Sequence, residues 1–249
     1  MVPKIITEAM SSVNLLYTEI KIPPVLNPET ICDLNDQLIL CLKQNVRFVV
    51  FTGNDSVFCN GLDLKWVANS KQKVRTEEMQ KYASFLKKIQ TEKFISISLV
   101  CGSVSGGGLG IVCASDYVIV EDSSTFSLPE GLLGLIPGMI LPSLLNRISP
   151  QQIKKMVFTG KKYPASFAID CGIADELVNI NEIQETLIQT INSMRSCKID
   201  SVADIKEMLY ESHLSQDSIA KKGMDILSKR LQEPEIEQRI KDISDFLED

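Results

Sequence analysis

Short apolar runs recur along the first half of the chain, separated by longer and more polar stretches. Residues 47–54, 94–102 and 116–122 are apolar runs of strand length, bounded by glycine, asparagine or acidic residues, which is typical of buried strands. Residues 124–130 begin a fourth strand, and the looser alternation over residues 13–22 indicates strands with a turn.

Amphipathic segments lie between these runs. Residues 26–45 place Pro28 and Glu29 at a helix start and continue with apolar positions at helical spacing, namely Ile31, Leu34, Leu38 and Leu42. Residues 65–93 are charged and rich in helix-favouring types, and the pattern becomes mostly helical from residue 151 onward. Strands that alternate with helices predict an α/β fold with βαβ-type winding and parallel pairing.

The C-terminal part of the chain has an amphipathic helical pattern. Its apolar positions lie among charged residues and on more than one helical face, which are too many for a helix that only meets water; they include Ile205, Leu209, Ile219, Met224 and Leu227. We therefore expect two parts, a core over residues 1–195 and a C-terminal helical region over residues 196–249.

Composition narrows the function classes. A length of 249 residues with 44% hydrophobic and 23% charged residues is typical of a globular protein with a substantial core. The net charge of -6 and a pI near 5.0 argue against a nucleic-acid-binding surface. No window reaches the roughly 18 apolar residues of a membrane span, and no signal peptide is expected. The seven cysteines form no CxxC pair, so we expect reduced thiols in a cytoplasmic protein.

Several common catalytic patterns are missing. Residues 102–106 (GSVSG) place Val104 where a nucleophile elbow has serine, and the chain's one histidine, His213, lies in the helical tail. A Ser-His-Asp triad therefore has no supporting motif. P-loop, GxGxxG and zinc-ligand spacings are also absent, so we expect no metal.

Three glycine-containing loops follow apolar strands. They cover residues 58–64 (FCNGLDL), 105–110 (SGGGLG) and 127–138 (SLPEGLLGLIPG), and ligands bind at such strand ends in wound α/β proteins. If the backbones of Leu62 and Gly107 face each other, their N–H groups can hold one carbonyl oxygen, as in an oxyanion hole, beside a helix start. The alternative is that the glycines only permit tight turns between strand and helix.

In order, approximate spacing and flanking strands, these loops resemble the signature segments of the crotonase superfamily, the enoyl-CoA hydratases and isomerases. The resemblance covers residues 15–178 well and the tail more loosely. It implies a spiral of ββα turns with a helical C-terminal trimerisation region, and so a homotrimer or hexamer. It also implies an acyl-thioester substrate, with acyl-CoA or an acyl carrier protein as partner. No separate cofactor is implied, because the substrate itself carries CoA or phosphopantetheine.

The resemblance also implies roles by motif position. The backbone N–H groups of Leu62 and Gly107 are the oxyanion-hole donors, and Glu130 is the catalytic acid/base. Substrate-binding roles fall to Gly61, Asp63, Gly106 and Trp66. Asp63 has a structural alternative as the cap of the following helix, and Trp66 either packs or lines the acyl pocket.

One position departs from the family's hydratases. They carry two glutamates, and the first corresponds here to Gly110, so that only Glu130 remains. Two-carboxylate hydration of an alkene is then in doubt. A single base can return an α-proton to a departing β-hydroxyl, which is a dehydration, or move it between two carbons, which is an isomerisation.

A finer resemblance favours dehydration. Residues 126–149 are similar to the dehydratase-type homologues of polyketide β-branching, which act on a hydroxymethylglutaryl (HMG) group held by an acyl carrier protein. The favoured hypothesis is therefore dehydration of a β-hydroxy, HMG-type acyl thioester. The alternatives are a Δ3-Δ2 enoyl-CoA isomerase, a non-catalytic member that binds acyl thioesters or a partner, and a hydrolase using Cys59 or His213.

Overall fold

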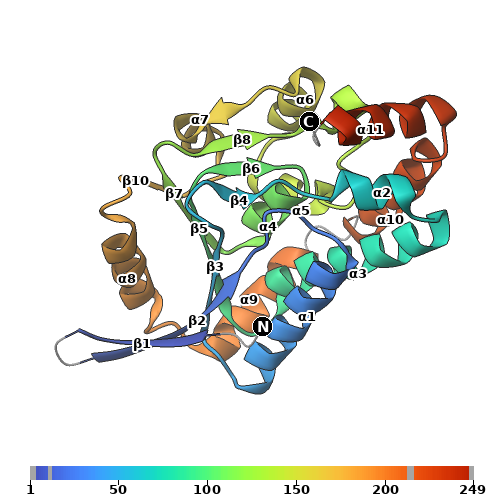
Figure 1. Ribbon diagram of the computed structural model, residues 1–249. Coiled ribbons are helices and arrows are strands. Elements are labelled where there is room, and N and C mark those ends of the chain that lie inside the picture. Colours follow the sequence, from blue (N-terminus) through green and yellow to red (C-terminus); the bar gives the residue numbers. More distant parts are fainter. Residues whose placement is uncertain (1–3, 11–12, 212–215, 247–249) are drawn as a thin grey trace.

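The computed structural model describes residues 4–10, 13–211 and 216–246 (Figure 1). Within these ranges, one sheet has the strand order β1-β2-β3-β5-β7-β10 and a second has the order β4-β6-β8-β9. In the larger sheet the neighbours along β2-β3-β5-β7-β10 pair in parallel, as do β4-β6-β8 in the smaller sheet. The β1–β2 and β8–β9 pairs are antiparallel. The strands are β1 (Lys4–Met10), β2 (Val13–Lys21), β3 (Phe48–Thr52), β4 (Val57–Cys59), β5 (Ile95–Val100), β6 (Ser103–Ser105), β7 (Tyr117–Glu121), β8 (Thr125–Ser127), β9 (Tyr163–Pro164) and β10 (Glu176–Val178).

Three successive strand pairs build a spiral. In each pair the first strand (β3, β5 or β7) enters the larger sheet, and the second (β4, β6 or β8) enters the smaller one. A helix or helical turn follows each pair, which confirms the predicted α/β spiral of ββα turns. The expectation of more than one strand over residues 13–22 is wrong, because β2 runs through this segment as a single strand paired with β1.

Helices cover both faces of the larger sheet. The charged segment 65–93 forms two helices, because Ser70 and Lys71 have extended backbones between them. The helices are α1 (Pro28–Lys43), α2 (Leu64–Asn69), α3 (Gln72–Thr91), α4 (Gly107–Ala114), η1 (Pro129–Leu133, 3-10), α5 (Leu141–Arg147), α6 (Pro150–Thr159), α7 (Ala165–Cys171), α8 (Ile183–Met194), α9 (Ile199–Glu211), α10 (Gln216–Arg230) and α11 (Pro234–Phe246).

Alternate residues of the sheet contribute to two cores. On β3, Val49 and Phe51 join the main core with the smaller sheet and helices α1, α3 and α4, whereas Phe48 and Val50 join a second core. This division follows from the two-residue period of a strand. Helix α8 and the buried Val202 of α9 cover the second core, and Figure 1 shows α8 apart from the other helices on that side.

The last two helices pack against the spiral itself. Leu227, Leu231, Ile236 and Ile240 are buried in the main core, so part of the apolar excess of the tail is satisfied within the chain. Three apolar residues of α9 remain exposed, namely Ile205, Met208 and Leu209. The homotrimer or hexamer, and the division at residue 195, stay predictions.

Two searches of the described ranges give negative results. No helix there has an apolar stretch of the length that a membrane crossing requires. No group of three or more histidine, cysteine, aspartate or glutamate residues in those ranges is arranged to hold a metal ion.

Candidate active site

The first two glycine loops meet at a point where no side chain fits. Gly61 has a φ of +85°, and a Cβ added to it would lie 2.7 Å from the Gly107 nitrogen. A Cβ on Gly107 would in turn lie 3.3 Å from the Gly61 Cα. The positive φ and the close backbone approach both require glycine at position 61. The loops after β4 and β6 are therefore held against each other by backbone contact.

Hydrogen bonds to Leu26 orient the backbone of Leu62. The Leu26 N–H donates to the Gly61 carbonyl at 2.7 Å, and the Asp63 N–H donates to the Leu26 carbonyl at 2.9 Å, which forms a parallel bridge between Leu26 and Leu62. In such a bridge the two bonds use the residues that flank Leu62, so the N–H of Leu62 points away from Leu26. Within the described ranges, this N–H donates no backbone hydrogen bond.

Gly107 supplies a second N–H at the start of α4. The first residues of a helix have no intrahelical acceptor for their N–H groups and carry the positive end of the helix dipole. The Gly107 carbonyl accepts a hydrogen bond of 2.5 Å from the buried hydroxyl of Tyr82. Tyr82 thus lies beneath the loop and positions it, whereas Leu62 and Gly107 both line one cavity.

Glu130 lies on η1, directly after β8. Its Oε1 is 3.2 Å from the point that a Cβ on Gly106 would occupy, and Gly106 has a φ of +49°. Its Oε2 is buried and has no hydrogen-bond partner within the described ranges. Burial raises the pKa of this carboxyl from 4.5 to about 7, although a hydrogen bond from its own backbone lowers it in part. A carboxyl with this pKa exchanges protons readily near neutral pH.

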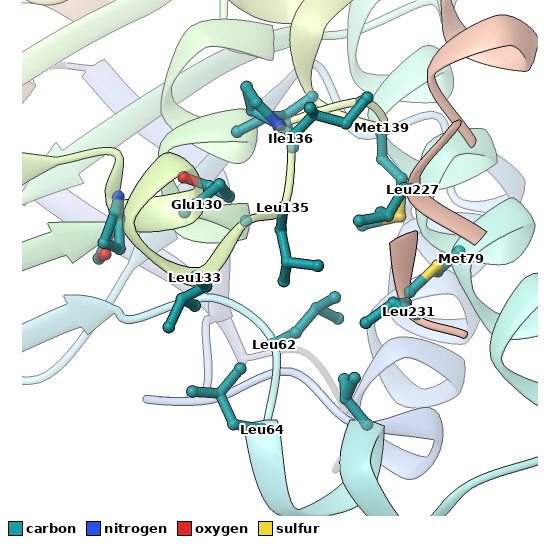
Figure 2. Close-up of a pocket in the computed structure, with 18 of the residues that line it drawn as sticks. Leu62, Leu64, Met79, Glu130, Leu133, Leu135, Ile136, Met139, Leu227 and Leu231 are labelled. Atoms are coloured by element: carbon teal, nitrogen blue, oxygen red, sulfur yellow. The ribbon is translucent and has the colours of Figure 1, made fainter. Parts of the chain in front are cut away.

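The cavity that holds these groups has a volume of about 120 Å³ and is mostly apolar. Its polar side chains within the described ranges are Asn60, Ser105 and Glu130. Figure 2 shows the carboxyl of Glu130 on one side and leucine and methionine side chains around the rest. The labelled apolar residues are Leu62, Leu64, Met79, Leu133, Leu135, Ile136, Met139, Leu227 and Leu231.

Gly110 lies on α4 and does not line this cavity, because Ile140, which does line it, packs against Gly110. A Cβ there would lie 2.4 Å from the Ile140 Cγ2 and 3.2 Å from the Leu86 Cδ1. The space that a larger side chain would need is filled by hydrocarbon. The departure at Gly110 is therefore built into the packing, and no carboxylate from this position stands opposite Glu130.

Two of the residues named for substrate binding, Asp63 and Trp66, do not line the cavity. The carboxylate of Asp63 accepts hydrogen bonds from the N–H groups of Lys65, at 2.9 Å, and Trp66, at 3.2 Å. This is the helix-capping alternative. Trp66 is partly buried against the main core and is not among the residues that line the cavity. Leu64 and Val67, three positions apart on α2, face the cavity, so Trp66 falls on a different side of the helix.

The other residues expected at the site lie in or beside the cavity. Gly106 and Gly107 line it, and the backbone of Gly61 packs against that of Gly107. Burial raises the pKa of the Cys59 thiol to about 12, so its nucleophilic thiolate form is disfavoured. His213 lies outside the described residues.

Sequence reasoning missed the residues that form the far wall. Leu227 and Leu231 come from α10 and the residue after it, and Met79 comes from α3. The four-residue spacing of the two leucines indicates a shared helical face. Nothing in that spacing shows which surface the face covers.

Comparison with known proteins places the chain in a family. The family model described as enoyl-CoA hydratase/isomerase matches residues 15–248. The chain belongs to this family. It is similar to the bacillaene synthase dehydratase PksH of Bacillus subtilis, with 33% identity over 158 residues, covering 59% of this chain and 61% of that protein. It is also similar to the carnitinyl-CoA dehydratase of Proteus mirabilis, with 28% identity over 167 residues, covering 66% of this chain and 63% of that protein. The matched region thus spans less than two thirds of either relative.

The fold extends the similarity over nearly the whole chain. The crystal structure of PksH from Bacillus subtilis superposes with a TM-score of 0.83 and covers 98% of this chain and 97% of its own, at 23% sequence identity. At this identity the likeness concerns the fold, and the crotonase architecture expected from the three loops is confirmed.

Proposed function

We propose that the protein removes water from a β-hydroxy acyl thioester, with Glu130 as the acid/base. The observation that carries the proposal is the Glu130 carboxyl, with a buried Oε2 and a pKa of about 7, in one cavity with the backbone of Leu62 and Gly107. The filled space at Gly110 removes the second carboxylate that hydration would use. Both similar relatives described above are dehydratases by name.

The reaction follows from these groups. The thioester carbonyl accepts hydrogen bonds from Leu62 and Gly107, which stabilise the enolate that forms when an α-proton leaves. The Glu130 carboxylate takes this proton and becomes a neutral acid. The C–O bond at the β-carbon then breaks as the α,β double bond forms. Glu130 returns its proton to the departing hydroxide, which leaves as water, and the carboxylate is restored.

The setting of this reaction is also proposed. PksH is named as a bacillaene synthase dehydratase, so we place the reaction in polyketide assembly in the cytoplasm, with acyl carrier protein as the favoured partner and acyl-CoA as the second choice. The HMG-type group favoured by the sequence is one member of the β-hydroxy acyl class.

The test compares the unmodified protein with Glu130→Gln, which keeps the size of the side chain and removes its acid/base chemistry. General acid–base catalysis contributes about 10²–10⁴-fold, so dehydration of a 3-hydroxyacyl thioester, followed by mass, should fall by at least about 100-fold. Near-normal turnover in Glu130→Gln would refute the assignment.

Two further substrates separate the neighbouring reactions. A 3-enoyl-CoA that changes its alkene position without a change in mass would favour isomerisation, which also needs a single proton carrier. Rapid hydration of crotonyl-CoA would show that another group replaces the carboxylate missing at Gly110.

A further inference from the structure

The far wall of the active-site cavity is hydrocarbon. It is formed by Met79 of α3, by Leu227 of α10 and by Leu231. Each of these side chains is at least 96% buried, with exposed fractions of 3%, 4% and 2%. Figure 2 shows all three grouped on the side of the cavity away from Glu130. Among the described lining residues, none is lysine, arginine or histidine.

Arg75 is a buried cation of α3 that lies outside the lining of the cavity. Arg75 lies one helical turn before Met79 and is 6% exposed. Its Nη1 donates to the Val67 carbonyl at 2.8 Å, which satisfies an acceptor near the end of α2. Its Nε is buried and has no hydrogen-bond partner within the described ranges. Arg75 does not line the cavity. A carboxylate at the far end of an acyl chain would therefore meet methyl groups.

Close contacts at glycines hold the C-terminal helices against the loop that follows Glu130. A Cβ on Gly223 of α10 would lie 2.7 Å from the Gly138 carbonyl oxygen, and one on Gly138 would lie 2.5 Å from the Gly223 oxygen. A Cβ on Gly134 would lie 2.2 Å from the side-chain Cδ1 of Ile236 on α11. Gly138 lines the cavity, so the loop that follows Glu130 and the C-terminal helices form one packed unit around it.

We propose that this wall selects acyl groups that end in hydrocarbon and rejects those that end in a carboxylate. The inference rests on the proposed dehydration for its reaction, and it changes the favoured substrate from an HMG-type thioester to a β-hydroxy thioester with a short neutral chain. An unpaired ionised carboxylate in such a site is strongly disfavoured. An apolar cavity of about 150 Å³ binds benzene, and the 120 Å³ here also holds the reacting carbons beside Glu130, so it suits a short acyl chain.

The test uses two thioesters that differ at one end. One carries 3-hydroxy-3-methylglutarate, and the other carries 3-hydroxy-3,5-dimethylhexanoate, in which an isopropyl group replaces the distal carboxylate. Unreactive thioether analogues of both on CoA are compared in binding, and the thioesters are compared in turnover. We expect the isopropyl compound to bind and react at least tenfold better.

Binding and turnover separate the two proposals. If neither thioester loses water and the isopropyl analogue still binds at least tenfold tighter, the dehydration proposal fails and the inference on substrate class stands. Equal or tighter binding of the carboxylate analogue overturns the inference, whichever reaction the protein performs.

A variant of the far wall should shift the binding preference toward the carboxylate analogue. Leu231→Lys places a cation at the far wall and should raise the ratio of carboxylate to isopropyl binding at least tenfold. Met208→Lys on α9 is the matched control, because Met208 is 71% exposed, and it should leave the ratio unchanged. An unchanged ratio in folded Leu231→Lys would contradict the assignment of the wall. The analogue pair on the unmodified protein decides the substrate class even where this variant unfolds.

Discussion

The two ends of the cavity have different origins in the chain. The polar end is formed by equivalent positions in three successive turns of the spiral, each just after the strand of the smaller sheet. Leu62 follows β4, Gly107 follows β6 and Glu130 follows β8. The far end combines Met79 with two leucines from the C-terminal region. The groups of the proposed reaction thus belong to the repeating fold, whereas the far wall combines one residue of the spiral with two residues that follow it. Under the two proposals, substitutions in α10 are expected to alter substrate choice and to leave the reaction unchanged.

The sharpest test of the polar end removes one backbone donor. Gly107 is the first residue of α4, where proline is tolerated because its missing N–H has no intrahelical partner. Gly107→Pro should lower kcat about 10²–10³-fold, the cost of one oxyanion-hole donor. Gly107→Ala keeps the N–H and is the control for space, since its Cβ meets the same atoms as that of proline, the Leu26 Cδ1 at 3.1 Å and the Gly61 Cα at 3.3 Å. Equal losses in both folded variants would show that space, and not the donor, matters here.

The same division explains what the sequence could and could not predict. The polar end was predictable because each of its residues sits in a short motif directly after a strand. The roles of Asp63 and Trp66 were less certain, because a helix start uses carboxylates as caps and three positions on one turn face different ways. The place of Leu227 and Leu231 in the cavity could not be predicted from the sequence, since only tertiary packing brings them to a loop about 90 residues earlier.

The second prediction concerns stability at the polar end. The pKa of Glu130 is raised from 4.5 to about 7 on folding, so its protonated form stabilises the fold at low pH and this stability is lost as pH rises from 4.5 through 7. A shift of this size corresponds to roughly 3 kcal/mol. Glu130→Gln should therefore raise the free energy of unfolding by up to about 3 kcal/mol at pH 8 and by much less at pH 5, measured by urea unfolding. A gain that is equal at both pH values would argue against burial of the charge.

The third prediction addresses the filled space beside the site. Gly110→Ala would force its Cβ against Ile140, and overpacking of this kind costs about 1–3 kcal/mol. Gly110→Glu should be at least as destabilising and should not confer crotonyl-CoA hydration, because the Ile140 side chain fills the space between position 110 and the cavity. Thermal unfolding and an assay of alkene absorbance measure the two effects. Hydration by a stable Gly110→Glu would show that the packing yields more easily than the contacts with Ile140 and Leu86 indicate.

The last prediction uses the pH dependence of kcat/KM to test the polar end and the far wall of the cavity together. Dehydration begins with Glu130 as a base, so the active form is the carboxylate, and burial places its pKa at about 7. Because kcat/KM reports the free enzyme, it should fall about tenfold for each pH unit below 7 and level off above it. The far wall has no titrating side chain among its described residues, and the distal carboxylate of an HMG-type substrate is already ionised above pH 6. The ratio of kcat/KM between the isopropyl and carboxylate thioesters should then stay constant from pH 6 to 8 while both values change. A ratio that varies over this range would place a titrating group at the far end of the cavity and break the separation between chemistry and selectivity.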